Sequence, residues 1–256
     1  MSGQIIGLAP GLAPTLDPWL QQGAGLYVRN WLQTRYGHAV ADIFGYHALQ
    51  LGASSLNTFA ASRIAHRWCA ADSLEDKRAT FYANASALPF FEATLDLVTL
   101  PFTLDLHSDP DSVLDEVARV LVPEGRVVIA GFNVFSLWNI TNSFLPKGTK
   151  TYGRSRLLGS LTEMGLEVER VDFGGYVPSV KTLEAANGYA WLDRLGARWW
   201  PSLGGCYFVT AKKRVMGVRP HRRVAWRLPR LSDILLNPFP TPEPKGLRKK
   251  KCKLPK

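Results

Sequence analysis

Two short apolar runs, Leu95–Phe102 and Arg126–Phe132, flank a segment in which apolar and polar residues recur with helical spacing. This segment, Asp111–Val122, places five apolar side chains on one side of a helix: Val113, Leu114, Val117, Val120 and Leu121. An apolar strand, an amphipathic helix and a second apolar strand predict a βαβ unit. Its two strands are therefore expected to be parallel and buried.

Similar patterns extend this unit in both directions. Further strands are predicted at His47–Leu51, Arg67–Ala71, Thr80–Ala83, Leu166–Phe173 and Cys206–Lys213. Helices are predicted at Trp19–Tyr36, Ala39–Tyr46, Thr58–Ala65 and Ser155–Met164, the first introduced by Asp17 and Pro18 as N-cap and N1 residues. Strands that alternate with helices predict an α/β fold with a doubly wound, mostly parallel, seven-stranded sheet and an antiparallel last strand.

The charge of the chain is concentrated near its C-terminal end. The formal net charge is +10, yet residues 211–256 hold fifteen Lys or Arg against two acids, so the other 210 residues are slightly acidic. We expect three parts: a leader and helix at residues 1–37, a domain at 38–213, and a basic, Pro-containing, mobile tail at 214–256. The tail is open to two interpretations, a solvated extension or a nonspecific contact of residues 212–256 with nucleic acid or an anionic surface.

The composition excludes several classes of protein. No run of eighteen apolar residues predicts a transmembrane segment, and the first twenty residues lack the pattern of a signal peptide. The cysteines Cys69, Cys206 and Cys252 are widely separated and form no CxxC pair, which argues against a metal site or a disulfide framework. These features favour a cytoplasmic, globular protein.

The central stretch, residues 84–133, resembles one family. LPF before the LDLV strand, followed by DP-x(3)-L-x-E-x-x-RVL-x-P-x-GR-x-V-I, resembles the C-terminal half of a class I S-adenosylmethionine-dependent methyltransferase domain of the type 11 group. The resemblance implies S-adenosylmethionine as the cofactor and an active enzyme. The acceptor that it would methylate is expected to be a small molecule, although neither it nor the acceptor atom can be identified from the sequence.

In this family a glycine-rich turn follows the first strand and approaches the cofactor closely. The best match is Gln50-Leu51-Gly52-Ala53-Ser54-Ser55-Leu56. Gly52 occupies the first glycine position, while Ser54 and Leu56 occupy the second and third, and Gln50 replaces the usual acid. The resemblance thus implies cofactor contacts from Gln50, Gly52, Ala53 and Ser54, on a degenerate motif that a plain strand–helix turn would also explain.

The resemblance also implies that residues at three further positions contact the cofactor. Asp72, about twenty residues beyond the turn, stands where an acid takes the two ribose hydroxyls, although it could equally cap a helix. Asn84 and Ala85 stand where the family contacts the adenine, and an Asn can do so through its carbonyl oxygen. Pro101, with its neighbours Leu100, Phe102 and Thr103 at the end of a strand, is expected to border the methionine part of the cofactor.

No catalytic residue can be assigned. His107 could act as a general base, or it could be a loop histidine bonded to backbone. The aromatic loop at 131–139 could cover an acceptor, and the Trp191–Trp200 segment could form core or an interface.

Two other functions therefore stay open. One is a methyltransferase-fold binding or regulatory protein without cofactor. The other is an RNA-associated methyltransferase directed by the basic tail.

Overall fold

We describe a computed structural model of the 256-residue chain. The structure describes residues 13–72, 76–136, 149–176 and 203–214, together with Leu145, Gly196 and Trp199. The chain divides into two units, residues 1–216 and 217–256. The second unit, and with it most of the predicted tail, lies outside the described residues, as do residues 137–139 of the 131–139 loop and nearly all of the Trp191–Trp200 segment.

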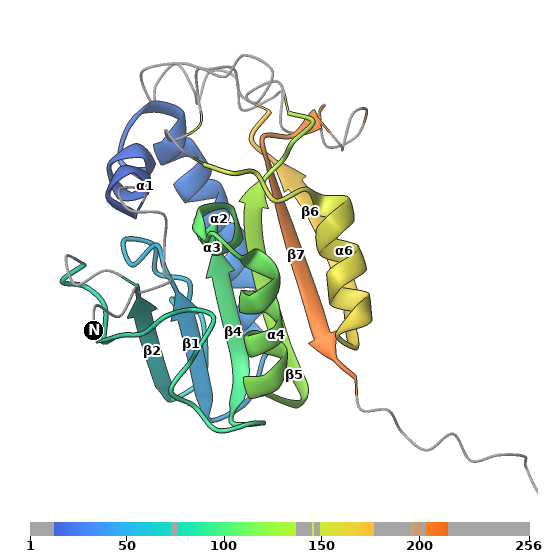
Figure 1. The fold of residues 1–256 in the computed structure, drawn as a ribbon. Helices are drawn as coiled ribbons and strands as arrows, with labels where there is room; N and C mark the ends of the chain where they lie inside the picture. The colour runs from blue at the N-terminus through green and yellow to red at the C-terminus, as the bar shows by residue number, and fades with distance from the viewer. Residues whose placement is uncertain are drawn as a thin grey trace, which may run out of the picture. The chain divides into compact units, whose positions relative to one another are not determined.

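A seven-stranded sheet with the order β3-β2-β1-β4-β5-β7-β6 forms the centre of the domain (Figure 1). Its strands are β1 (His47–Leu51), β2 (His66–Ala71), β3 (Phe81–Tyr82), β4 (Leu95–Pro101), β5 (Leu121–Phe132), β6 (Leu166–Gly174) and β7 (Cys206–Lys213). The pairs from β3 to β5 are parallel, and β7 runs antiparallel to both of its neighbours. The predicted fold class, with its antiparallel last strand, is confirmed.

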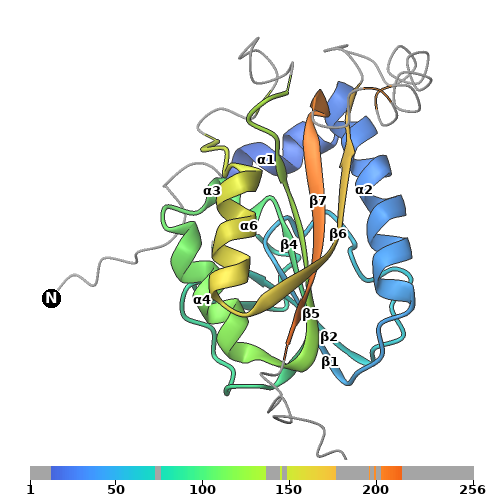
Figure 2. The same ribbon diagram turned by 90° about the vertical axis from the view of Figure 1, so that its right-hand side faces the viewer.

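Helices cover both faces of this sheet, as Figure 2 shows with α2 on one side and α4 and α6 on the other. The helices are α1 (Ala13–Leu20), α2 (Gly23–Ala41), α3 (Thr103–Leu106), α4 (Pro110–Val120) and α6 (Arg154–Glu163). Leu20, Leu32 and Val40 of α1 and α2 pack in one apolar cluster. Val113 and Val117 of α4 pack with Leu157 of α6 in the other, so the sheet is buried on both sides.

The predicted βαβ unit is present. The helix between β4 and β5 begins at Pro110, and the carboxylate of Asp109 accepts the backbone N–H of Ser112 at 3.3 Å as an N-cap. The buried residues of α4 are Val113, Leu114, Val117 and Val120, as the helical spacing indicated, but the helix ends at Val120, and Leu121, predicted on the same face, is the first residue of β5. The hydrophobic period therefore identified both the helix and the face that it buries.

Three predictions of local structure near the N-terminus are wrong. The chain forms two helices, α1 and α2, where one was predicted, and Asp17 and Pro18 lie inside α1 and not at a helix start. The predicted helix at 39–46 is only the end of α2, which stops at Ala41. The predicted helix at 58–65 is a series of turns. Tertiary packing overrides local helix propensity in these segments. The side chains of Leu16 and Leu20 in α1, and those of Phe59 and Ile64 in the turns, are all buried in the same apolar cluster.

Candidate cofactor site

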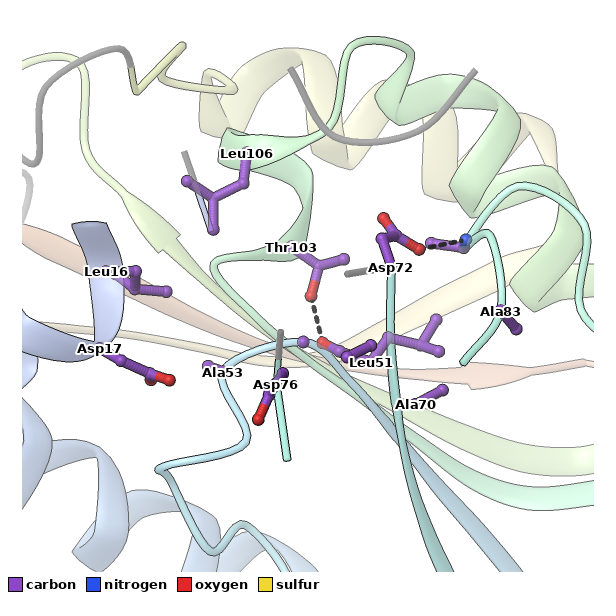
Figure 3. A pocket seen from close by; sticks show the side chains of 13 residues that line it. Leu16, Asp17, Leu51, Ala53, Ala70, Asp72, Asp76, Ala83, Thr103 and Leu106 are labelled. Carbon is purple, nitrogen blue, oxygen red and sulfur yellow. Dashed lines mark hydrogen bonds between the residues drawn. The ribbon is translucent and has the colours of Figure 1, made fainter. Parts of the chain in front are cut away.

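A pocket opens at the carboxyl ends of β1, β2 and β4 (Figure 3). This is where open α/β sheets bind ligands. The pocket has about 560 Å³ of empty space, part of which is open to solvent. The centre of a water molecule can occupy only about 50 Å³ of that space without touching the walls too closely. The pocket is therefore a narrow recess. Four of the residues predicted to bind a cofactor line it: Gly52, Ala53, Asp72 and Ala85.

The turn after β1 bends sharply at two successive residues. Gly52 has a φ of +74° and Ala53 a φ of +41°, the left-handed region that glycine adopts without strain. The N–H of Gly52 donates to the carbonyl oxygen of Ala70 in the neighbouring β2, 2.9 Å away. The turn thus brings backbone, and not a bulky side chain, to the edge of the pocket.

The side chain of Gln50 holds this turn in shape. It is 4% exposed. Its Nε2 atom donates to the carbonyl oxygens of Gly52, Ala53 and Leu56 at 2.9–3.1 Å. Its Oε1 atom accepts the hydroxyl of Thr58 at 2.7 Å. The side-chain amide of Gln50 is therefore engaged within the loop, and a direct contact with a cofactor stays a prediction.

Two serines of the turn bind carboxylates from other segments. Ser54 donates to Oδ1 of Asp76 at 2.6 Å, and Ser55 donates to Oδ1 of Asp17 in α1. Both acids line the pocket. The prediction missed them, because Asp17 precedes Pro18 in the pattern of a helix start and Asp76 lies in a charged segment without a motif. Leu56, at the third glycine position, is buried in the core with 1% exposure.

Asp72 follows β2 and offers one carboxylate oxygen to the site. Oδ1 accepts the backbone N–H of Ala85 at 3.1 Å, as drawn in Figure 3. Oδ2 is buried and has no hydrogen-bond partner among the described residues. Burial raises the pKa of Asp72, while a positive charge on His107 and the N–H of Ala85 lower it. An unpaired buried acceptor is costly, so Oδ2 is suited to a hydroxyl donor from a ligand.

The other predicted residues lie beside the pocket. Oδ1 of Asn84 accepts the N–H and the hydroxyl of Ser86 at 3.0 and 2.8 Å. Pro101 is the buried last residue of β4, paired with Ala130 of β5. Neither lines the recess, and whether they contact a cofactor stays a prediction.

Phe102 and Thr103, which were predicted to border the methionine part of the cofactor, lie at the end of β4, and they are followed by Asp105, which the sequence did not single out. Phe102 is fully buried at a φ of +59°, an uncommon conformation for a bulky residue and one that clusters at functional sites. Next to it, Thr103 lines the pocket and donates its hydroxyl to the carbonyl oxygen of Leu51 at 2.5 Å. Asp105 is 1% exposed and accepts the N–H groups of Phe132 and Tyr152 at 2.8 and 2.7 Å. Burial raises the pKa of Asp105 to about 7, against the effect of these two bonds.

The lining is acidic. Asp17, Asp72 and Asp76 border the recess, and the described lining residues include no Lys, Arg or His. The other described lining residues are apolar except Thr103: Leu16, Leu51, Gly52, Ala53, Ala70, Ala71, Ala83, Ala85 and Leu106. A pocket of this kind attracts a ligand with a positive charge and an apolar body.

Several known proteins are similar to parts of this chain. Residues 45–129 match the methyltransferase domain family. The uncharacterized protein YafS of Escherichia coli K12 is 28% identical over 160 residues, 59% of this chain and 65% of that protein. The ubiquinone/menaquinone biosynthesis C-methyltransferase UbiE of Hahella chejuensis is 37% identical over 90 residues, 34% of each chain. The chain thus spans less than two thirds of the length of these curated relatives.

Among solved structures, the chain is similar to one in a complex between the Haloferax volcanii Trm112 methyltransferase activator and a methyltransferase. The TM-score is 0.54 at 18% identity, over 80% of this chain and 98% of the other. At that identity the similarity concerns the fold alone. No helix in the described part of the chain is long and apolar enough to cross a membrane.

Proposed function

We propose that this chain, whose residues 45–129 match the methyltransferase domain family, is a class I S-adenosylmethionine-dependent methyltransferase that transfers a methyl group to a small-molecule acceptor. The observation that carries the proposal is the unpaired Oδ2 of Asp72 beside the left-handed turn at Gly52 and Ala53. The first is an acceptor for a ribose hydroxyl. The second lets a ligand approach the backbone closely, so the described residues fit the cofactor.

When bound, S-adenosylmethionine would supply a methyl group on a positively charged sulfur; an acceptor's lone pair would form a bond to the methyl carbon as the carbon–sulfur bond breaks, with S-adenosylhomocysteine as the leaving group. The residues of the chain bind and orient. The carboxylate of Asp72 accepts hydrogen bonds from a vicinal diol. Asp17 and Asp76 add negative charge at the edge of the recess and favour a cationic ligand. Positioning is the main requirement for this transfer, so the absence of an assigned catalytic base is compatible with the proposal.

Calorimetry with S-adenosylmethionine and S-adenosylhomocysteine tests this proposal. The wild-type protein should bind both, and Asp72→Asn should weaken binding by about 10- to 100-fold, because the amide replaces a charged acceptor. Asp115→Asn, an exposed site on α4, serves as the matched control and should bind like the wild type. Absence of binding to the wild-type protein at near-millimolar ligand would refute the proposal.

Two observations favour a second candidate function, that of a methyltransferase-fold protein that has lost cofactor binding. Leu56 fills the third glycine position and the recess is narrow. The same calorimetry separates the two functions, since this second candidate requires that neither ligand binds.

The relatives do not identify the molecule that this chain would methylate. UbiE is named for C-methylation in quinone biosynthesis, but its alignment covers only 34% of either chain. Contact of the basic tail with nucleic acid also stays a prediction. A filter-binding titration across salt concentrations would test it, with a strong salt dependence as the expected result.

A further inference from the structure

Three exposed aromatic side chains lie at the edge of the sheet opposite the cofactor recess. Phe44 and Tyr46, just before β1, are 69% and 75% exposed, and Phe91, in the loop that leads into β4, is 88% exposed. β1 and β4 are neighbouring parallel strands, so both segments lie at the amino ends of the strands, whereas the recess lies at the carboxyl ends. Single apolar side chains are common on protein surfaces, but large aromatic ones gathered at one edge indicate a contact surface.

Hydrogen bonds hold the backbone of both aromatic segments. Oδ2 of Asp96, in β4, accepts the backbone N–H groups of Tyr46 and His47 at 2.7 and 2.9 Å. The hydroxyl of Thr94 donates to the carbonyl oxygen of Phe91 at 2.9 Å. The rings are therefore presented on a fixed backbone, which lowers the entropy cost of binding through them.

The last described strand ends at this same edge. The register places Ala48 of β1 level with Arg126 of β5, and Arg126 level with Lys212 of β7. Because β7 is antiparallel to β5, it ends at Lys213 beside the amino ends of β1 and β4, at the bottom of Figure 1. Three strand spacings of about 4.8 Å separate β1 from β7, so the chain leaves the sheet about 15 Å from Tyr46.

The sequence beyond this point carries the net charge of the protein. Residues 215–256 hold twelve Lys or Arg and two acids, a formal charge of +10, which equals that of the full chain. In residues 215–236 the basic residues are interspersed with large apolar ones, among them Trp226, Leu228 and Leu231. This mixture favours an anionic lipid surface over nucleic acid as the partner, since a lipid interface takes up apolar and basic side chains together.

We propose that the edge formed by Phe44, Tyr46 and Phe91 docks on an anionic lipid surface, with the three rings in the interface and the basic residues of 215–256 near the headgroups. Aromatic side chains favour this boundary between water and lipid. Two exposed acids, Asp42 and Glu92, are close to the rings in sequence, so attraction to the surface depends on the charge of 215–256. The docking is independent of methyl transfer, because the recess lies at the opposite edge.

Co-sedimentation of the full-length protein with lipid vesicles tests the proposal. Vesicles of phosphatidylcholine and phosphatidylglycerol in equal parts should bind the wild type at least about 10-fold more tightly than vesicles of phosphatidylcholine alone, and salt should weaken this binding. The triple variant Phe44→Ser, Tyr46→Ser and Phe91→Ser should lose about 10-fold or more in affinity for the anionic vesicles, because its rings no longer enter the interface. Phe91→Ser alone should show an intermediate loss.

Phe135→Ser is the matched control. Phe135 is also 69% exposed, but it follows β5 at the carboxyl end of that strand. This variant should bind the vesicles like the wild type. Thermal unfolding of each variant identifies any loss that arises from the fold, and the substituted side chains are all exposed.

A second variant tests the basic residues, with Gln in place of Lys249, Lys250, Lys251 and Lys253. It should bind the anionic vesicles at least about 10-fold more weakly than the wild type, since each basic residue near the surface adds to the attraction. An aromatic triple variant or a Lys-to-Gln variant that binds like the wild type would overturn the proposal, as would a wild type that does not prefer the anionic vesicles. Polyuridylate binding that the three Ser substitutions weaken just as strongly would assign the edge to nucleic acid and also overturn it.

Discussion

The hydroxyl of Ser55, in the turn after β1, donates a hydrogen bond to the carboxylate of Asp17 in α1. This bond ties the first described helix to the turn that approaches the cofactor site. Leu16 and Asp17 form one wall of the narrow recess, and Trp19 packs edge-on against Phe102 and Phe132. S-adenosylmethionine needs more room than the recess offers, so the proposed function requires that one of its walls moves when the cofactor binds.

We therefore predict that Ser55→Ala raises the association rate of S-adenosylhomocysteine by about 2- to 5-fold, since an exposed or half-buried hydrogen bond contributes about 0.5–1 kcal/mol. Stopped-flow fluorescence of the tryptophans measures this rate. Thr34→Ala, which removes an exposed hydroxyl from α2, is the control. An association rate equal to that of the wild type would show that α1 does not limit entry.

The second prediction concerns Gln50, which replaces the acid usual in the family. Gln50→Glu restores that acid, yet it should lower the free energy of unfolding at pH 7 by about 3 kcal/mol, because a buried carboxylate would face three carbonyl oxygens without a donor. Chemical denaturation measures the change, with the exposed Gln21→Glu as the control. If both variants unfold like the wild type, Gln50 does not organise the turn.

The third prediction compares the two left-handed residues of the turn. Gly52→Ala should lower the free energy of unfolding by about 1–2 kcal/mol, because a Cβ is strained at a φ of +74°. Ala53→Gly should raise it by about 0.5 kcal/mol, since relief of strain slightly exceeds the backbone entropy of glycine. Gly159→Ala, at an open helical position of α6, controls for the added methyl and should stabilise the protein. A Gly52→Ala variant as stable as the wild type, or an Ala53→Gly variant that is less stable than the wild type, would contradict the described turn.

The fourth prediction concerns pH and Asp105. The folded protein holds the Asp105 proton up to about pH 7, whereas the unfolded chain releases it near 3.9. The unfolded state therefore binds fewer protons between these values, so the contribution of Asp105 to stability is complete below about pH 4 and falls as pH rises to about 7. The fall should be at most about 1.4 kcal/mol per pH unit.

Urea denaturation from pH 4 to 8, on the wild type and Asp105→Asn, measures this effect. The difference between the two free energies of unfolding should shift against the wild type as pH rises and level off above about 7. A constant offset is also expected, because an amide offers only one acceptor to the N–H groups of Phe132 and Tyr152. A difference that does not vary with pH would mean that Asp105 is ionised throughout this range in the folded state.

The core of the fold could be read from local patterns. The period of Val113, Leu114, Val117 and Val120 identified α4 and its buried face. The apolar runs identified β4 and β5. The N-terminal region was less predictable. Asp17 and Pro18 match a helix start in the sequence, but they lie within α1, since the helix position depends on burying Leu16 and Leu20.

Part of the site could also be predicted. Gly52, Ala53, Asp72 and Ala85 line the recess as the family resemblance implied. Thr103 was predicted from its place at the end of a strand, but its hydrogen bond to Leu51, 52 positions away, was not. Asp105 carries no signal in the sequence, and its contacts are with Phe132 and Tyr152, 27 and 47 positions away.

The sequence by itself determined the alternation of strands and helices, the parallel sheet and the place of Asp72 after β2. Hydrophobic period and spacing depend on neighbours in the chain, so they suffice for these features. The tertiary structure decided that Ser55 donates to Asp17, that the side-chain amide of Gln50 binds carbonyl oxygens of its own loop, and that Thr103 donates to Leu51. These pairings depend on how loops at one sheet edge converge, and no local pattern encodes that convergence.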